Sequence, residues 1–308
     1  MLDLEFMTAK PPTQTAPLRS PYHYTPTRWV CLTFLSLFGI STVAHVGQVL
    51  LYRAWYLLPT AALCGILEIV GWVSRLSSSK DPHVLLPYEI QMTATIIAPT
   101  PLLAANFLTL GKVVERLGSR YCRIAPKTYS IIFLGCDLIA LAVQGTGGAI
   151  ASIAVGKSKD PDNGGHIMLG GIIFQLVAII AYSFLATEFI VRYITENAFS
   201  GGDDASARGE LTLRLKVLLS ALGVNTFCLV VRAIYRTVEL INGFSGSVIS
   251  TQWYFNIFDG AMVALAIFIV NFAHPGMLLR QNAKKSDKKV EDTGSEVRLQ
   301  LIGPDERH

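Results

Sequence analysis

The residues best suited to chemistry in this sequence are ionisable side chains that lie within long apolar runs. Arg232, Arg236 and Glu239 follow directly on the apolar run Val217–Val231. Their spacing of four and then three residues places all three on one face of a helix. A guanidinium at membrane depth is costly unless it faces protein or water. The pattern therefore predicts a membrane helix whose charged face meets polar partners on other helices.

Further polar residues interrupt the other apolar runs in the same way. Glu68 and Arg75 lie seven residues apart and share a helix face, as do Asp137 and Gln144. Such groups should face the interior of a bundle or a wet cavity. We expect them to form a polar, substrate-binding pocket in the outer half of the membrane. The predicted binding residues are Glu68, Arg75, Gln91, Asp137, Gln144, Gln175, Arg232, Arg236, Glu239 and Asp259.

An alternative interpretation gives the same residues a purely structural role. Polar side chains of membrane helices also form ion pairs and amide links that only hold the helices together. The sequence does not determine which of Glu68, Asp137 and Asp259 pairs with which of the arginines. Both interpretations predict that the polar groups point inward.

Composition places the chain among polytopic membrane proteins. Of its 308 residues, 51% are hydrophobic and only 16% are charged, against about 25% charged residues in an average soluble domain. The five cysteines do not resemble a disulfide framework, since four lie inside apolar runs. The net charge of +4 follows the loops and the tail, so it indicates topology rather than nucleic-acid binding. We expect no removable signal peptide.

Seven apolar segments are long enough to cross a hydrocarbon layer about 30 Å thick. They are Thr27–Leu51, Trp55–Leu76, Tyr88–Val113, Tyr129–Val155, Ile167–Ile194, Leu213–Arg236 and Trp253–Ala273. Pro99 and Pro101 should interrupt the third, because proline removes backbone donors. The expected fold is all-α, a seven-transmembrane-helix bundle at residues 27–274. Residues 1–26 are expected to be a flexible extracytoplasmic tail, and residues 275–308 a charged, disordered cytosolic tail.

The distribution of basic residues predicts the orientation of this bundle. Seven Lys and Arg residues belong to the N-terminal side of the seven crossings and seventeen to the other side. Because basic residues favour the cytosolic side, the N-terminus should be outside and the C-terminus cytosolic.

No signature of an enzyme or of a nucleotide site survives inspection. The stretch Ala151–Ser158 resembles half of a phosphate-binding loop, but an alanine replaces its first glycine and it leaves a membrane helix on the outer side. No cysteine pair has zinc-site spacing. The glycines of Gly145–Gly148 are better interpreted as close helix packing.

Two weaker polar signals have structural interpretations. His45 should be a buried hydrogen-bonding histidine, and Glu188 and Arg192 should form an interfacial pair. We expect no catalytic residue, metal or cofactor.

Several of these residues, in order and spacing, resemble one known family. The matching motifs are Glu68-x-x-Gly71-Trp72-x-x-Arg75, Tyr88-x-x-Gln91, Asp137 with Gln144 and Gly145, Gly171 with Gln175, Arg232-x-x-Tyr235-Arg236-x-x-Glu239, Phe258-Asp259 and His274-Pro275-Gly276. They are similar to those of the fungal lipid-translocating exporters, seven-span proteins linked to aminocholesterol resistance and sphingoid long-chain-base release. Among the departures, Trp72 stands where tyrosine is usual and Gln252 where many members have glutamate.

The resemblance implies an integral membrane protein of the plasma membrane, or of internal membranes, that moves or resists amphiphilic lipids. The first hypothesis is therefore a transporter or translocator of a sphingoid base, a toxic sterol-like compound or a secondary metabolite, which would give efflux or resistance. The alternative is a seven-span receptor or stress sensor that binds an external lipid-like ligand. The expected partners are an amphiphilic lipid and the membrane lipids, without nucleic acid, and the oligomeric state is left open.

Overall fold

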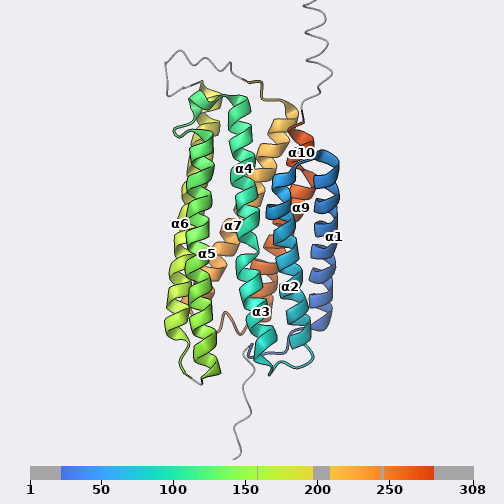
Figure 1. Ribbon diagram of the computed structural model, residues 1–308, viewed down its shortest axis with the longest axis vertical. Helices are drawn as coiled ribbons and strands as arrows, with labels where there is room; N and C mark the ends of the chain where they lie inside the picture. The colour runs from blue at the N-terminus through green and yellow to red at the C-terminus, as the bar shows by residue number, and fades with distance from the viewer. Residues whose placement is uncertain (1–21, 158, 197–208, 244–245, 281–308) are drawn as a thin grey trace, which may run out of the picture.

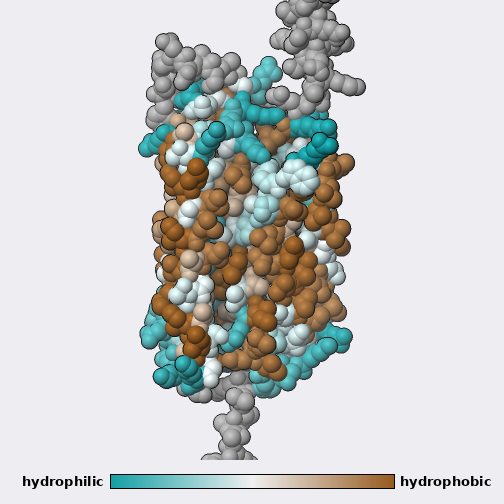
Figure 2. Space-filling model, viewed as in Figure 1, coloured by the Kyte–Doolittle hydropathy of each residue, from teal (hydrophilic) through white to brown (hydrophobic). Residues whose placement is uncertain are grey.

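The computed structural model describes residues 22–157, 159–196, 209–243 and 246–280, and this part of the chain is helical without strands (Figure 1). Seven of its helical segments are long and apolar enough to cross a membrane. Figure 2 shows an apolar belt around the visible face, with polar residues gathered at both ends. The protein is an integral, multi-pass membrane protein, as the sequence predicts.

Four of the seven spans are single helices and three are composite. The single ones are α1 (Arg28–Tyr52), α5 (Pro126–Gly156), α6 (Asp162–Thr195) and α7 (Leu213–Ile241). The second span comprises η1 (Trp55–Leu57), η2 (Leu58–Ala62) and α2 (Leu63–Ser78), and the third comprises α3 (Leu85–Ile97) and α4 (Pro99–Leu117). The seventh comprises α8 (Gln252–Tyr254), η4 (Phe255–Ala261), α9 (Met262–Phe272) and α10 (Pro275–Leu278). A short turn, η3 (Ser119–Tyr121), follows the third.

The predicted segments match these spans, although most spans are longer than predicted. The fourth, fifth and seventh extend the prediction to Pro126–Gly156, Asp162–Thr195 and Gln252–Leu278. The third span runs from Leu85 to Leu117, longer at both ends than predicted, and the sixth continues past Arg236 to Ile241. The sixth continues because Arg236 and Glu239 are buried, at 1% and 2% exposure, instead of lying at the membrane surface.

The spans run alternately up and down, so the described chain starts and finishes at opposite ends of the bundle (Figure 1). We call these the N-terminal end, where Tyr22 lies, and the C-terminal end, where α10 lies. Helices α5 and α6 form one side of the bundle, and α1, α2 and α9 form the other. Helix α7 runs obliquely behind α4.

Three spans depart from regular α-helix. The third is interrupted at Ala98, directly before Pro99, which confirms the predicted effect of the two prolines. Segments η2 and η4 are π-helical. A π-helical turn inserts an extra residue, so it changes which side chains face inward along the span.

Helices α5 and α6 approach so closely that glycine is required at their contact. A Cβ atom on Gly147 would lie 2.4 Å from the backbone nitrogen of Met168, and one on Gly164 would lie 2.3 Å from that of Ala151. Gly145, in contrast, faces nothing within 4 Å. The prediction of close packing by Gly145–Gly148 is therefore confirmed at Gly147 and not at Gly145.

Two short segments that we assigned to the tails pack against the bundle. Tyr22 is buried, with 3% of its surface exposed, and its hydroxyl donates to Ser78 Oγ at 3.1 Å. Pro275 is buried at the start of α10, and a Cβ atom on Gly276 would lie 2.9 Å from the Cβ of Ala54. The remaining predicted tails, residues 1–21 and 281–308, lie outside the described residues.

The glycine contact can be tested with a matched pair of substitutions. Gly147→Leu should lower the free energy of unfolding by about 1–3 kcal/mol, because the new side chain meets backbone atoms that have no room to move. Gly145→Leu, two residues away on an open face, should have little effect. Thermal unfolding of the purified protein in detergent checks this, and equal melting temperatures for the two variants would contradict it.

Candidate functional site

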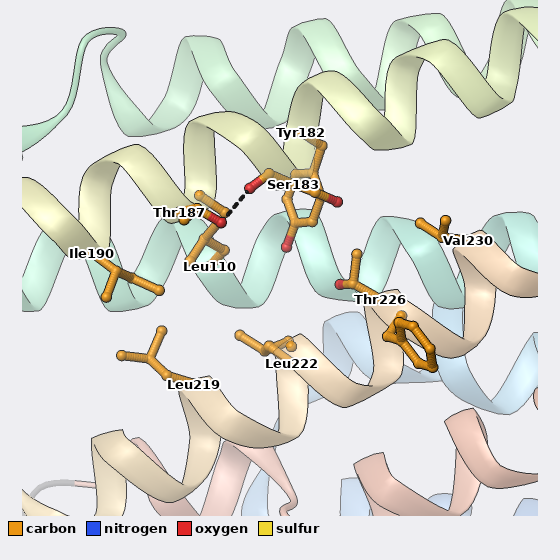
Figure 3. A pocket seen from close by; sticks show the side chains of 12 residues that line it. Leu110, Tyr182, Ser183, Thr187, Ile190, Leu219, Leu222, Thr226 and Val230 are labelled. Carbon is orange, nitrogen blue, oxygen red and sulfur yellow. Dashed lines mark hydrogen bonds between the residues drawn. The ribbon is translucent and has the colours of Figure 1, made fainter.

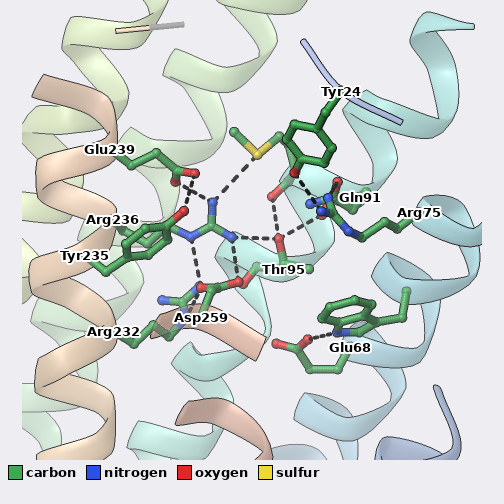
Figure 4. A network of polar contacts seen from close by, with 12 residues as sticks. Tyr24, Glu68, Arg75, Gln91, Thr95, Arg232, Tyr235, Arg236, Glu239 and Asp259 are labelled. Atoms are coloured by element: carbon green, nitrogen blue, oxygen red, sulfur yellow. Dashed lines mark hydrogen bonds and ion pairs between the residues drawn. The ribbon is translucent and has the colours of Figure 1, made fainter. Parts of the chain in front are cut away.

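Arg236 and Asp259 form the centre of a buried polar network between α7, α3 and η4 (Figure 4). The guanidinium donates through Nε to Oδ1 of Asp259 at 3.0 Å and through Nη2 to Oδ2 at 2.8 Å. This bidentate geometry is the strongest form of arginine–carboxylate pairing. Nη1 donates to Glu239 Oε2 at 2.7 Å, and Nη2 also donates to Thr95 Oγ1 at 2.9 Å. The predicted ion pairing across helices is therefore present.

Arg232 shares the same carboxylate. Its Nε lies 2.9 Å from Asp259 Oδ1, and its Nη2 donates to the carbonyl oxygen of Thr95 at 2.5 Å. One aspartate thus neutralises two arginines, and both arginines also reach Thr95. Because Thr95 precedes the interruption at Ala98 by one helical turn, the broken span supplies both its hydroxyl and its carbonyl oxygen to the network.

Glu68 lies beside this network without an arginine in hydrogen-bond contact. Its Oε2 accepts from Trp72 Nε1 at 3.2 Å, whereas its Oε1 has no hydrogen-bond partner among the described residues. Only 1% of the residue is exposed. In Figure 4 its carboxylate lies below and to the right of Asp259. Glu68 is therefore the carboxylate beside this network whose second oxygen can still accept a hydrogen bond.

Arg75 is held by neutral groups. Its Nη1 donates to Gln91 Oε1 at 3.1 Å and its Nη2 to Tyr24 Oη at 2.7 Å. Its guanidinium carbon also lies 4.4 Å from the centre of the Phe255 ring, within cation–π range. Among the described residues no carboxylate pairs with it, so the sequence-based expectation that an acid would be available to Arg75 is not met.

We call these residues the charge cluster. Its ionisable members are Glu68, Arg75, Arg232, Arg236, Glu239 and Asp259, and its neutral members include Tyr24, Gln91 and Thr95. Three arginines face three carboxyl groups, so the cluster is neutral when every member is ionised. Each ionisable member is 6% exposed or less. All six are therefore enclosed within the bundle.

The remaining three predicted residues form a second network between α4, α5 and α6, which we call the carboxyl–amide cluster. Gln175 Nε2 donates to Asp137 Oδ1 at 2.6 Å and to Thr100 Oγ1 at 3.2 Å. Gln144 Nε2 donates to Gln175 Oε1 at 3.0 Å. Thr95 and Thr100 lie on either side of Ala98, so the two clusters meet the same broken span at successive turns. The ten predicted residues therefore divide into seven and three.

Sequence reasoning missed several neutral partners. Tyr24 falls in the predicted flexible tail. Thr95 lies in an apolar run, where a single threonine does not indicate a polar site. A sequence signal was present for Trp72, which lies between Glu68 and Arg75 on the same helix and contacts both. The predictions of a buried, hydrogen-bonded His45 and of a pair between Glu188 and Arg192 are confirmed. His45 Nε2 lies 3.2 Å from the carbonyl oxygen of Ile267, and Glu188 pairs with Arg192 at 2.9 Å.

The electrostatic balance of the charge cluster gives a stability prediction. Asp259→Asn should lower the free energy of unfolding by about 3–5 kcal/mol, because it leaves two buried guanidinium groups without their shared counter-charge. Asp162→Asn makes the same change at an exposed position and should have little effect. The measurement is thermal unfolding in detergent at neutral pH. A melting temperature for Asp259→Asn equal to that of the unmodified protein would contradict the assignment.

The chain is similar to a known protein family and to several named proteins. The family described as RTA1 like protein matches residues 61–282. The sphingoid long-chain base transporter RSB1 of Saccharomyces cerevisiae is 26% identical over 81% of this chain and 72% of its own length. Protein RTA1 of the same organism is 29% identical over 82% of this chain and 84% of its own.

A third relative comes from a filamentous fungus. The probable lipid transporter atnI of Emericella nidulans is 25% identical over 80% of this chain and 65% of its own length. No solved structure matches this chain. The matched family range begins at η2, continues just past α10 and contains every ionisable member of the charge cluster. The chain belongs to the RTA1-like family.

Proposed function

We propose that this protein translocates a long-chain amphiphile of the sphingoid-base class across its membrane, and so gives efflux of, or resistance to, such compounds. The names of two relatives support a lipid as the cargo. The alternative of a seven-span receptor has no comparable support, because the relatives whose names state an activity are transporters.

The observation that carries the proposal is the unpartnered oxygen of Glu68 within a balanced charge cluster. An ammonium head group brings hydrogen-bond donors and one positive charge. Asp259 is already shared by Arg232 and Arg236, so it has little capacity for a further cation. Glu68 supplies the acceptor, while the hydrocarbon chain of the amphiphile stays in an apolar environment.

We infer that this site can rearrange around a head group. Glu239 contacts Arg236 from the next turn of the same helix, and Asp259 lies within the π-helical segment η4. When a cationic head group binds Glu68, Arg232 and Arg236 keep Asp259 and Glu239 as partners. The carboxylate and the hydrogen-bond acceptors inside the bundle lower the cost of moving the cation through it. All ten predicted binding residues remain part of this proposal, with Glu68 as the group that meets the head group first.

We also propose that the energy for transport comes from an existing gradient or that none is needed, since the sequence offers no nucleotide-binding motif. The proposed role involves no covalent chemistry, cofactor or metal. Substrate selection then depends on how well the head group and the chain fit the bundle.

Basic residues support an orientation with the N-terminal end outside. Among the described residues outside the charge cluster, those at or near the C-terminal end are Arg53, Lys112, Arg116, Arg120, Arg123, Lys127, Arg192, Arg214, Lys216 and Arg280. Those at the N-terminal end are Arg28, Lys80, Lys157 and Lys159. Since the positive end faces the cytosol, the charge cluster belongs to the outer half of the membrane.

This orientation can be tested with epitope tags. A tag at the N-terminus should bind antibody on intact cells that carry the protein at their surface, and a tag at the C-terminus should bind only after permeabilisation. The reverse pattern would place the charge cluster in the cytosolic half and contradict the orientation.

The transport proposal is tested with purified protein in lipid vesicles. A fluorescent sphingoid base is placed in one leaflet, and its appearance in the other is followed with a membrane-impermeant quencher. Glu68→Gln should slow transfer about tenfold or more, because a charge-assisted hydrogen bond contributes about 1.5–3 kcal/mol. Glu188→Gln makes the same chemical change in the ion pair at the C-terminal end of α6 and should transport normally.

Two outcomes would count against the proposal. Unchanged transfer by Glu68→Gln would remove Glu68 from the site. No accelerated transfer of any amphiphile by the unmodified protein would favour the receptor alternative.

A further inference from the structure

A second feature of the bundle lies away from both polar clusters. A cavity of about 330 Å³ lies between α4, α6 and α7 (Figure 3). Its floor includes the buried residues Leu110, Tyr182 and Thr226. Its rim includes Gly223 and Phe227, which are exposed on the outside of the bundle. The cavity is therefore a groove that opens sideways, towards the lipid.

The oblique course of α7 accounts for this opening. At the N-terminal end of the bundle, where α7 finishes, this helix packs on α6. There Leu240 forms a cluster with Met168 and Ile172. Towards its start α7 diverges from α6, and the small residues Gly223 and Ala186 leave the gap between the two helices unfilled. Figure 3 shows side chains from α6 and α7 facing one another across this gap.

The dimensions of the groove suit one hydrocarbon chain. Along α7 it extends from Leu219 to Val230, eleven residues and so about 16 Å, which is roughly half of a 30 Å hydrocarbon layer. Its volume is about 330 Å³. The groove therefore has room for one alkyl chain laid along α7. The groove thus covers the depth of one leaflet, the one at the C-terminal end.

We propose that this groove binds the alkyl chain of a single-chain amphiphile that enters sideways from the leaflet at the C-terminal end. The inference rests on the proposed function, to which it adds the site that selects the chain. The head group would then lie near the membrane surface at the C-terminal end, where Ile190 and Leu219 line the groove.

A short polar route connects the floor of the groove with the interior of the bundle. Asn106 Nδ2 donates to Asn225 Oδ1 at 2.6 Å and lies 3.4 Å from Thr226 Oγ1, on the floor of the groove. Asn225 Nδ2 in turn donates to the carbonyl oxygen of Ala266 at 2.7 Å. Asn106 Oδ1 is buried without a hydrogen-bond partner among the described residues. These amides offer a moving head group polar contacts at mid-depth.

The groove and the charge cluster use different faces of α7. Phe227 and Arg236 are nine residues apart, about two and a half helical turns, so they point in opposite directions. The chain site and the head-group site are therefore separate, at different depths. An amphiphile would occupy them in succession, with Thr226 and Asn225 at the crossing between the two faces.

Packing rather than hydrophobicity must hold the chain in this groove. The surrounding lipid is as apolar as the groove, so an alkyl chain that moves from lipid into the groove gains no hydrophobic free energy. The gain comes from close contact with the walls, which is lost when the space is blocked. Because an added Cβ on Gly223 meets nothing within 4 Å, a large side chain there can fill the groove without displacing the backbone.

The test uses the full-length protein in phosphatidylcholine vesicles with a sphingoid base that carries a photoactivatable diazirine on its chain. After illumination, mass spectrometry should locate the label on residues of the groove, including Phe227 and Val230. Gly223→Phe should reduce that labelling about fivefold or more and should shift the transport preference towards bases with shorter chains. Gly170→Phe, at an exposed glycine of α6 that also has open space around it and does not line the groove, should change neither readout.

The outcomes separate this inference from the proposed function. Unaltered labelling and chain preference in Gly223→Phe, with normal transport by the unmodified protein, would overturn the chain site alone. Equal labelling by a two-chain phosphatidylcholine with the same diazirine would mean that bulk lipid fills the groove, and would also overturn it. Labelling of the groove that Gly223→Phe removes would support the chain site even if the unmodified protein moved no amphiphile, a result that would contradict only the proposed function.

Discussion

The structure depends on how three buried arginines are accommodated in a bundle surrounded by hydrocarbon. Arg232 and Arg236 share Asp259, and Arg75 is enclosed by a tyrosine hydroxyl, a glutamine and aromatic rings. A charge at this depth persists only with such partners. The partners come from the segment before α1 and from the second, third, sixth and seventh spans, so the same contacts that neutralise the charges also fix these segments relative to one another. Charge neutralisation and bundle assembly are one constraint here.

The two halves of the bundle differ in chemistry. The charge cluster lies towards the N-terminal end, and its acids and bases are balanced within one closed interior. The groove between α6 and α7 lies towards the C-terminal end and offers mainly apolar walls to the lipid. A long-chain amphiphile has the same division between a polar head and an apolar chain. In the proposed function each half of the bundle meets one part of the amphiphile, with the amides of Asn106 and Asn225 at intermediate depth.

The helices also differ in how firmly they are packed. Helices α5 and α6 contact through glycines that allow their backbones to touch, a geometry that favours a fixed pair. The second, third and seventh spans instead contain π-helical turns or an interruption, and the latter two breaks lie beside the charge cluster. Irregular helical turns are frequent at functional sites because they place side chains where a regular helix cannot. Asp259 reaches two arginines from such a turn.

Sequence alone determined the seven spans, the inward-facing polar residues and the break at Pro99, because hydrophobic length and proline chemistry are local properties. It also indicated that Arg232, Arg236 and Glu239 share one helix face and need partners. Only the tertiary structure decided that Asp259 serves both Arg232 and Arg236, that Arg75 has neutral partners, and that Asp137 belongs to a separate cluster. Pairings between helices depend on rotation, depth and irregular turns in several spans at once, and none of these is encoded in the spacing within one segment. The groove escaped sequence reasoning for the same reason, since it arises where α7 diverges from α6 and not from any motif in either helix.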